Sequence, residues 1–274
     1  MSLETSKEKL TQDLIKAFTD AKEAGKTKPE GPDDIIIQMS KDVTTATDAY
    51  FVTAIVETDV EVKPGQLDTA AGTTTNTGSG KGVGTIVPGV PLMVSNDFTK
   101  LVEDAYKKSR DEGAKGIDPM ENIKNLSFDL AAAIFEYMSS AKVTTTITIN
   151  PGQVGAGIGG AGNYTTPGPG AGTGEVAFDN QPGYDLDAAL EAAFKKSMDA
   201  GAKTDCNPDD IIKELATDMS EAIHNFATSA EVSTDGMLTG GAVIVGYLTP
   251  VGAPLPAVSS PTVLGLVTGA GGLS

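Results

Sequence analysis

Apolar residues recur at helical spacing in three stretches of the chain, and the three stretches match one another. In each stretch they follow at offsets of about four, seven and eight positions, which places them on one face of a helix. Each stretch closes on a glycine, which is typical of a left-handed residue after the last helical turn. We therefore predict one amphipathic helix per copy. The matching positions are Leu10, Leu14, Ala17, Phe18 and Gly25; Phe98, Val102, Ala105, Tyr106 and Gly113; and Leu186, Leu190, Ala193, Phe194 and Gly201.

A second helix is predicted after each of these stretches, beginning at Pro32, Pro119 and Pro208. Proline suits the first helical position, where no N–H donor is required. Asp118 precedes Pro119 and Asn207 precedes Pro208, and both side chains can cap the free N–H groups. Gly31 precedes Pro32 and caps less well. The acidic residues of the first turns match the helix dipole, so we interpret them as capping residues rather than as metal or catalytic residues. They are Asp33, Asp34, Glu121, Asp209 and Asp210.

The second helices also match in their apolar positions, which follow the prolines at steps of three and four. Their length predicts helices of roughly 30 Å at 1.5 Å per residue. Each copy is thus expected to contain a helical hairpin. The matching positions are Ile36, Met39, Val43, Ala46, Tyr50 and Ala54; Ile123, Leu126, Leu130, Ala133, Tyr137 and Ala141; and Ile212, Leu215, Met219, Ala222, Phe226 and Ala230.

The period then changes to two. The segments "AIVETDVEV" and "AKVTTTITI" are rich in β-branched residues, as strands are. One face of the first strand would carry Val56, Thr58, Val60 and Val62, and the matching face of the second would carry Val143, Thr145, Ile147 and Ile149. The third copy begins alike with "AEVST" but continues with Asp235-Gly236, which predicts a hairpin turn.

These patterns predict an α+β fold of three tandem repeats, each a two-helix hairpin followed by a strand or hairpin and joined to the next by Gly/Pro-rich extended arms. The repeats either close around a pseudo-threefold axis or lie in a row. The arms are either flexible spacers or extended segments on a neighbouring subunit, where glycine permits close backbone approach. The expected domains are 1–66 (repeat 1), 67–95 (Gly/Thr-rich arm), 96–153 (repeat 2), 154–183 (Gly/Pro-rich arm), 184–247 (repeat 3 with its divergent hairpin) and 248–274 (apolar C-terminal tail).

Composition limits the partners of the chain. The 274 residues carry a net charge of −17, which repels phosphate backbones and excludes nucleic acid as an expected partner. One cysteine permits no internal disulfide framework. The chain has no apolar stretch of the length needed to span a membrane, and its N-terminus does not resemble a signal peptide. We therefore expect synthesis in a cytoplasm and no membrane partner.

No catalytic, cofactor-binding or metal-binding residue is predicted, and the chain is not expected to be an enzyme or to need a cofactor. "GAGIGG" (155–160) contains a GxGxxG, but no helix follows it as nucleotide binding requires. "GSGKG" (78–82) departs from the phosphate-loop spacing. His224 is the single histidine and Cys206 the single cysteine, so neither has the partners of a zinc site or of a nucleophile and base. We expect a partly exposed helix histidine and an incidental cysteine.

The first helices also share a short motif whose lysines separate the copies. "YKKSRDEG" (106–113) and "FKKSMDAG" (194–201) carry the pairs Lys107-Lys108 and Lys195-Lys196, where the first copy has Thr19-Asp20. The aromatic residue is expected to face the core and the lysines to be solvated. The lysine pairs then mark the surface on which the copies have diverged.

At the junction of helix and strand the phrases "AAIFEYMSSAKVTTTIT" (132–148) and "EAIHNFATSAEVST" (221–234) resemble repeat-containing virion structural proteins of large tailed bacteriophages. The text typical of that family is Ala-Ile-His-aromatic, then Ala-x-Val-Thr-Thr, followed by Gly-rich Val-Pro-Gly text. Ala-Ile-His stands only in copy three, and copy one, "TATDAYFVTAIVET", departs most from the pattern. The resemblance implies a non-enzymatic particle component, a capsid decoration or a head or tail accessory protein. Its partners would be capsid or tail subunits, and it would be present in many copies in the virion. A host-recognition or adhesive appendage protein is the alternative, and an enzyme is the third reading.

Overall fold

The computed structural model of the chain describes the backbone over most of its length and the side chains of its helical part. Side chains are described for residues 3–26, 31–56, 98–141 and 186–230. The described backbone comprises residues 3–27, 31–62, 67–69, 72–74, 79–87, 95–149, 153–154, 163–165, 169–177, 184–238, 243–245, 258–260 and 265–273.

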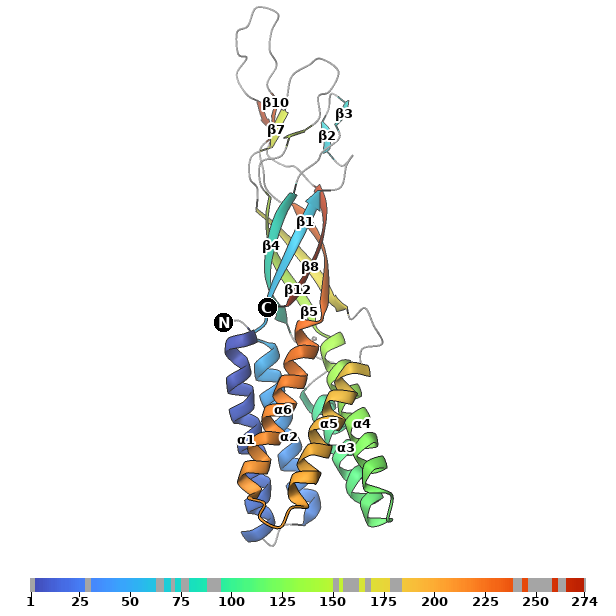
Figure 1. Cartoon of the computed structure of the whole chain (residues 1–274). Helices are drawn as coiled ribbons and strands as arrows, with labels where there is room; N and C mark the ends of the chain where they lie inside the picture. The colour runs from blue at the N-terminus through green and yellow to red at the C-terminus, as the bar shows by residue number, and fades with distance from the viewer. Residues whose placement is uncertain are drawn as a thin grey trace, which may run out of the picture.

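In the described part of the chain, six helices occur where the apolar periodicity predicts them, two in each copy. Consecutive helices contact one another, and the last contacts the first, so the helices form a closed ring. The three copies therefore lie around a common axis rather than in a row (Figure 1). The helices are α1 (Leu3–Thr27), α2 (Pro32–Phe51), α3 (Ser95–Ala114), α4 (Pro119–Ser139), α5 (Tyr184–Gly201) and α6 (Pro208–Thr228).

The predicted starts of the second helices are confirmed. Proline occupies the first turn of α2, α4 and α6. The Asp118 side chain accepts hydrogen bonds from the backbone N–H groups of Met120 and Glu121, and the Asn207 side chain accepts one from Asp209. Gly31 provides no side-chain cap. The acidic residues of these turns thus lie at the positive ends of helices, as the capping interpretation requires.

The predicted end of the first helices is wrong in one respect. Helix α1 continues through Gly25 to Thr27, and Gly113 lies inside α3. Among the described residues the glycine with positive φ is Gly116, in the loop between α3 and α4. All three glycines that close the repeated motif therefore belong to helices, Gly201 as the last residue of α5. The described glycine with positive φ comes later, in the loop after α3.

The bundle core consists of the matching apolar positions. Leu14, Val102 and Leu190 are at most 1% exposed, and Val43, Leu130 and Met219 at most 5%. Each helical hairpin has one apolar face that it cannot bury by itself, and closing the ring buries all three faces against one another. The core is therefore shared by the repeats, and no copy has a core of its own.

Tyr106 is the exception among these matching positions. It lies where the other copies have Phe18 and Phe194, and its hydroxyl is buried without a hydrogen-bond partner among the described residues. Burial also raises the pKa of the Tyr106 hydroxyl. We expect Tyr106→Phe to raise the free energy of unfolding by about 1 kcal/mol, because it removes an unsatisfied polar group. Urea unfolding measures this, and Phe18→Tyr should have the opposite sign. A loss of stability in Tyr106→Phe would contradict the prediction.

Six long strands form a closed antiparallel barrel in the order β1-β12-β9-β8-β5-β4. In each copy the strand after the second helix is followed by a return strand that pairs with it. Two of the return strands come from segments predicted to be arms, and the third comes from the segment predicted to be the apolar C-terminal tail. The strands of the barrel are β1 (Ile55–Val62), β4 (Ser79–Val87), β5 (Lys142–Ile149), β8 (Pro169–Ala177), β9 (Glu231–Leu238) and β12 (Gly265–Leu273).

The barrel repeats the same register three times. Gly82 lies opposite Thr58 and Ile147, Gly172 opposite Thr145 and Gly236, and Gly269 opposite Thr234 and Val60. These pairs occupy equivalent positions of the three copies. The pairing therefore has threefold pseudo-symmetry about the barrel, in agreement with the closed ring of helices.

The predicted fold class is wrong. Where side chains are described, the protein is a single helical bundle in which only Ile55 and Val56 belong to a strand. The three copies do not form separate α+β units joined by extended arms. The physical reason is that a two-helix hairpin cannot bury its apolar face alone, so the helices of all copies segregate into one layer, and the predicted arms supply paired strands instead.

The predicted Asp235-Gly236 hairpin is also wrong. Strand β9 runs straight through both residues, and Asp235 pairs with Thr173 on one side and Thr268 on the other. A central strand that pairs on both sides keeps its extended conformation because each flanking strand supplies hydrogen-bond partners. The third copy therefore ends as the other two do, with a strand and a return strand.

The molecule is a rod whose three parts follow one another along its length (Figure 1). The helical bundle lies at one end and the barrel in the middle. Both chain ends lie at the junction between them, where Leu273 pairs with Val56. Short strands lie beyond the barrel: β2 (Leu67–Thr69) pairs with β3 (Gly72–Thr74), and β11 (Val258–Ser260), β10 (Val243–Val245), β7 (Asn163–Thr165) and β6 (Gln153–Val154) form a small sheet.

Candidate functional site

The three junctions between neighbouring copies in the bundle differ in chemistry. The threefold relation makes each contact at one junction comparable with the same positions at the other two. Three layers of such contacts run from the barrel end of the bundle to its far end. In each layer two junctions carry a polar pair.

The layer nearest the barrel contains His224, which is buried rather than partly exposed as predicted. Its Nδ1 lies 2.7 Å from the Tyr50 hydroxyl on α2, and its Nε2 lies 3.0 Å from the Glu4 carboxylate on α1. Histidine with an Nε2 proton donates to the carboxylate and accepts from the hydroxyl, so both ring nitrogens are satisfied. His224 thus joins α6 to both helices of the first copy.

Tyr137 and Asp48 form the equivalent contact between the second and first copies. The Tyr137 hydroxyl donates to the Asp48 carboxylate. Burial and this bond to an anion both raise the pKa of Tyr137. At the third junction the same two positions hold Phe226 and Phe135.

The middle and far layers repeat this arrangement. Thr11 and Ser220 bond at 2.6 Å between the first and third copies, and Thr44 and Thr99 bond at 2.9 Å between the first and second; the third junction has Ala131 and Asp187 at these positions. At the far end Lys22 pairs with Asp209, and Arg110 pairs with Asp33. There the third junction has Met198 and Met120. The α4–α5 junction thus lacks the polar pair in every layer.

The junction of the third copy with the first has no chain connection across it, and it has an ion pair of its own. Lys7 of α1 lies 2.9 Å from the Glu221 carboxylate of α6. Hydrogen bonding to Lys7 and the positive charge of Lys7 lower the pKa of Glu221. Hydrogen bonding and charge from Lys22 likewise lower the pKa of Asp209. Both acids therefore favour the closed ring when they are ionised.

These shifts predict that closure weakens in acid. Because its folded-state pKa is depressed, Glu221 contributes stability above its unfolded pKa of about 4.3, and that contribution is lost as the pH falls through the folded-state pKa. We expect Lys7→Met to be less stable than the wild type at pH 7 by less than about 1 kcal/mol, since the pair is partly exposed, and to match the wild type below about pH 3. Urea unfolding across this pH range measures the difference.

Lys195→Met is the matched control, because Lys195 forms no ion pair with a described residue. Its difference from the wild type should be small and independent of pH. A Lys7→Met deficit that stays constant from pH 7 to pH 3 would show that the Lys7–Glu221 charge pair does not contribute to closure.

The lysine pairs of the first helices have partners in the structure. Lys108 lies 2.7 Å from Asp129, and Lys196 lies 2.8 Å from Asp218 and 2.9 Å from Glu214. These pairs join the two helices of one copy. Lys108 and Lys196 are exposed, as predicted, and each also links the two helices of its own hairpin through an ion pair.

The remaining motifs bring no chemistry together. Cys206 is exposed, and its Sγ lies 3.6 Å from the Gly201 carbonyl oxygen. Ser79–Gly82 of "GSGKG" form the start of β4, and "GAGIGG" lies outside the described residues. In the described part of the chain no group of histidine, cysteine or acidic residues has the arrangement of a metal site. No helix there is both long and apolar enough to cross a membrane.

The junction pairs were missed in the sequence, although a signal for them exists. The matching apolar positions align the copies, and the positions between them then show which residues replace one another. His224, Asp48 and Phe135 share one position, and so do Lys22, Arg110 and Met198. What the sequence could not supply is which copy lies next to which, because that requires the closed ring.

Comparison with known proteins adds no relative. No protein-family model, no curated protein and no solved structure matches the chain.

Proposed function

We propose that the chain is a non-enzymatic structural protein of a viral particle, either a capsid decoration or an accessory protein of the head or tail. The observation that carries the proposal is the cyclic arrangement of three copies of one unit in a single chain. Such a unit is a one-chain counterpart of a homotrimer. It suits the threefold and quasi-threefold positions that symmetric assemblies present.

The differences among the copies support the same proposal. A homotrimer must show the same surface on all three sides, whereas this chain varies each side separately. Polar pairs close two junctions, and the third has no such pair in any of the three layers. A particle protein that meets unlike neighbours around a pseudo-threefold site benefits from such variation. The resemblance of residues 132–148 and 221–234 to phage virion proteins points to the same class.

In this proposal the partners are capsid or tail subunits, and neither nucleic acid nor a membrane is bound. The protein is made in the host cytoplasm and carried in the virion in multiple copies. The bundle and barrel form a rod (Figure 1), so one end can dock while the other projects from the particle surface.

Quantitative mass spectrometry of purified particles of the virus that encodes the chain tests the proposal. We expect the protein at a fixed ratio to the major capsid or tail protein through successive purification steps. Cross-links between the chain and a particle subunit should then identify the docked end. Particles that lack the protein, or hold it at a ratio that falls with each wash, would refute the structural role.

A host-recognition or adhesive appendage is the second candidate. The observation that favours it is the position of the short strands β2, β3, β6, β7, β10 and β11, which come from all three copies and lie at the end remote from the bundle (Figure 1). Binding of the purified chain to host cells or to their surface glycans would support this candidate. Stoichiometric incorporation without such binding would favour the decoration role.

A further inference from the structure

The outer surface of α4 and α5 is apolar where the corresponding surfaces of the other two junctions are polar. Five exposed positions define this α4–α5 face: Phe128, Ala132, Ala188, Ala192 and Met198. Because the three copies are related by threefold pseudo-symmetry, the same positions can be compared at the other two junctions. The α2–α3 junction has Lys41, Thr45, Lys100, Asp104 and Arg110 at these positions, and the α6–α1 junction has Thr217, Glu221, Gln12, Lys16 and Lys22.

Phe128 is the most exposed large apolar residue of the described chain, at 61%, and Met198 is 36% exposed. Single exposed apolar residues are common and need no explanation. Here, however, the polar alternative is known at each position, because both other junctions of the same fold use polar side chains. The α4–α5 face is thus apolar at positions that are polar at the other two junctions, and exposed apolar patches mark interaction surfaces.

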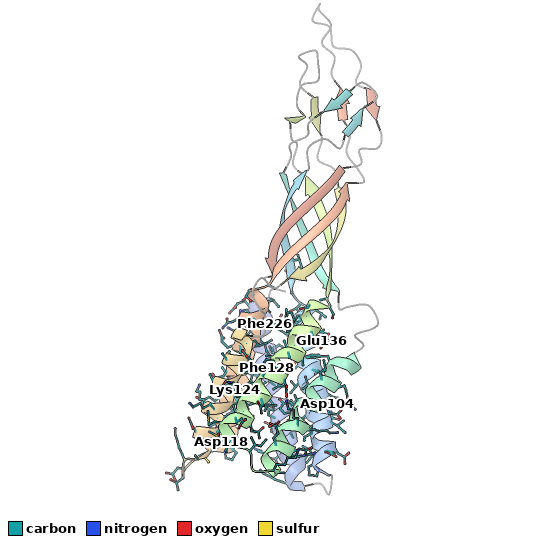
Figure 2. All side chains as sticks on the ribbon, turned by 90° about the vertical axis from the view of Figure 1, so that its right-hand side faces the viewer. Asp104, Asp118, Lys124, Phe128, Glu136 and Phe226 are labelled. Atoms are coloured by element: carbon teal, nitrogen blue, oxygen red, sulfur yellow. The ribbon has the colours of Figure 1, made fainter. Side chains whose placement is uncertain are left out.

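The charges that flank the face identify its partner. Lys124, Phe128 and Glu136 lie along one side of α4 (Figure 2), with Ala132 between the last two. Lys124 lies four residues before Phe128, and Glu136 lies four residues after Ala132. Neither charged residue forms an ion pair within the described part of the chain. A twofold axis between Phe128 and Ala132 therefore places each Lys124 against the Glu136 of an antiparallel copy.

The same axis places large residues against small ones. Phe128 of each copy then meets Ala132 of the other, and small residues at a helix contact let the axes approach to about 8 Å. An isologous contact of this kind uses one self-complementary patch twice. We propose that the outer face of α4, centred between Phe128 and Ala132, is a homodimer interface in which two copies pack antiparallel. This inference does not depend on the role of the protein in a particle.

Sedimentation equilibrium of the full-length chain over a range of concentrations tests the proposal. We expect the wild type to dimerise and Phe128→Thr, which introduces the residue found at this position in the third copy, to raise the dimer Kd at least about a hundredfold, because each interface loses two buried aromatic side chains. Circular dichroism confirms that the variant is folded. A wild type that stays monomeric throughout the range would overturn the proposal.

Charge reversal tests the geometry. Lys124→Glu alone and Glu136→Lys alone should each weaken the dimer, because each places like charges opposite one another. The double variant Lys124→Glu/Glu136→Lys should restore it, since the exchanged charges again face each other. Lys213→Glu, at the position of Lys124 in the third copy, is the matched control and should leave the Kd unchanged. A double variant that associates no better than the single variants would overturn the antiparallel arrangement.

Discussion

Gly82→Val is expected to destabilise the protein by about 3 kcal/mol or more, although valine is the better strand former. Gly80, Gly82 and Gly84 alternate along β4 and therefore share one face of the sheet. Gly170, Gly172 and Gly174 do the same in β8. In β12 Gly269 and Gly271 occupy the matching register positions. Three of the six barrel strands thus repeat glycine on one face.

The register places this face inside the barrel. Gly84 pairs with Val56, which is fully buried, and cross-strand partners share a face of the sheet. Eight strands enclose an interior just wide enough for side chains to fill, so six strands leave less room. Added volume at the glycine positions of this face therefore cannot be accommodated without displacing the neighbouring strands.

Thermal and urea unfolding measure the effect, with Lys81→Val as the matched control. Lys81 follows Gly80 in the same strand and lies on the opposite face, so its replacement should change stability by less than about 1 kcal/mol. Gly172→Val, at the equivalent position of the second copy, should repeat the loss seen for Gly82→Val. Equal stability of Gly82→Val and Lys81→Val would show that the glycine face does not line a tight interior.

The helices could be predicted from the sequence because their signals are local. Apolar spacing, proline at the first position and the caps Asp118 and Asn207 all lie within a few residues of the features they determine. The same locality explains the errors. "SGKG" (79–82) and "PGAGTG" (169–174) have the composition of loops, and only pairing with distant strands makes them parts of β4 and β8. Asp235-Gly236 likewise has the local preference of a turn, which two flanking strands override.

The junction contacts depend on the same long-range information. Tyr50 meets His224, and Tyr137 meets Asp48, only because the third copy closes on the first and the second lies beside it. A row of repeats would have given the same helices without the first of these pairs. The amino-acid sequence therefore shows which residues differ between the copies. Which of these residues meet at a junction follows only from the closed ring.

The Tyr50–His224 pair gives the second large expected effect. Tyr50→Phe leaves the buried Nδ1 of His224 without its partner, and His224→Phe leaves the buried Tyr50 hydroxyl unpaired. We expect each single change to cost about 1–3 kcal/mol, the penalty for an unsatisfied buried polar group. The double variant Tyr50→Phe/His224→Phe should lose less stability than the two single variants together. It creates a phenylalanine pair like that of Phe135 and Phe226 at the third junction.

A double-mutant cycle by urea unfolding at pH 7 measures the coupling between the two residues, which should be about 1 kcal/mol or more for groups in direct contact. Tyr50→Phe combined with Lys16→Ala is the matched control, since Lys16 lies on the outer surface of α1 and contacts neither residue. The effects of Tyr50→Phe and Lys16→Ala on the free energy of unfolding should add. Additive losses in the Tyr50–His224 cycle would mean that the two residues stabilise the ring independently. Coupling would mean instead that complementary side chains match neighbouring copies at this layer. The matching pair is polar at two junctions and apolar at the third.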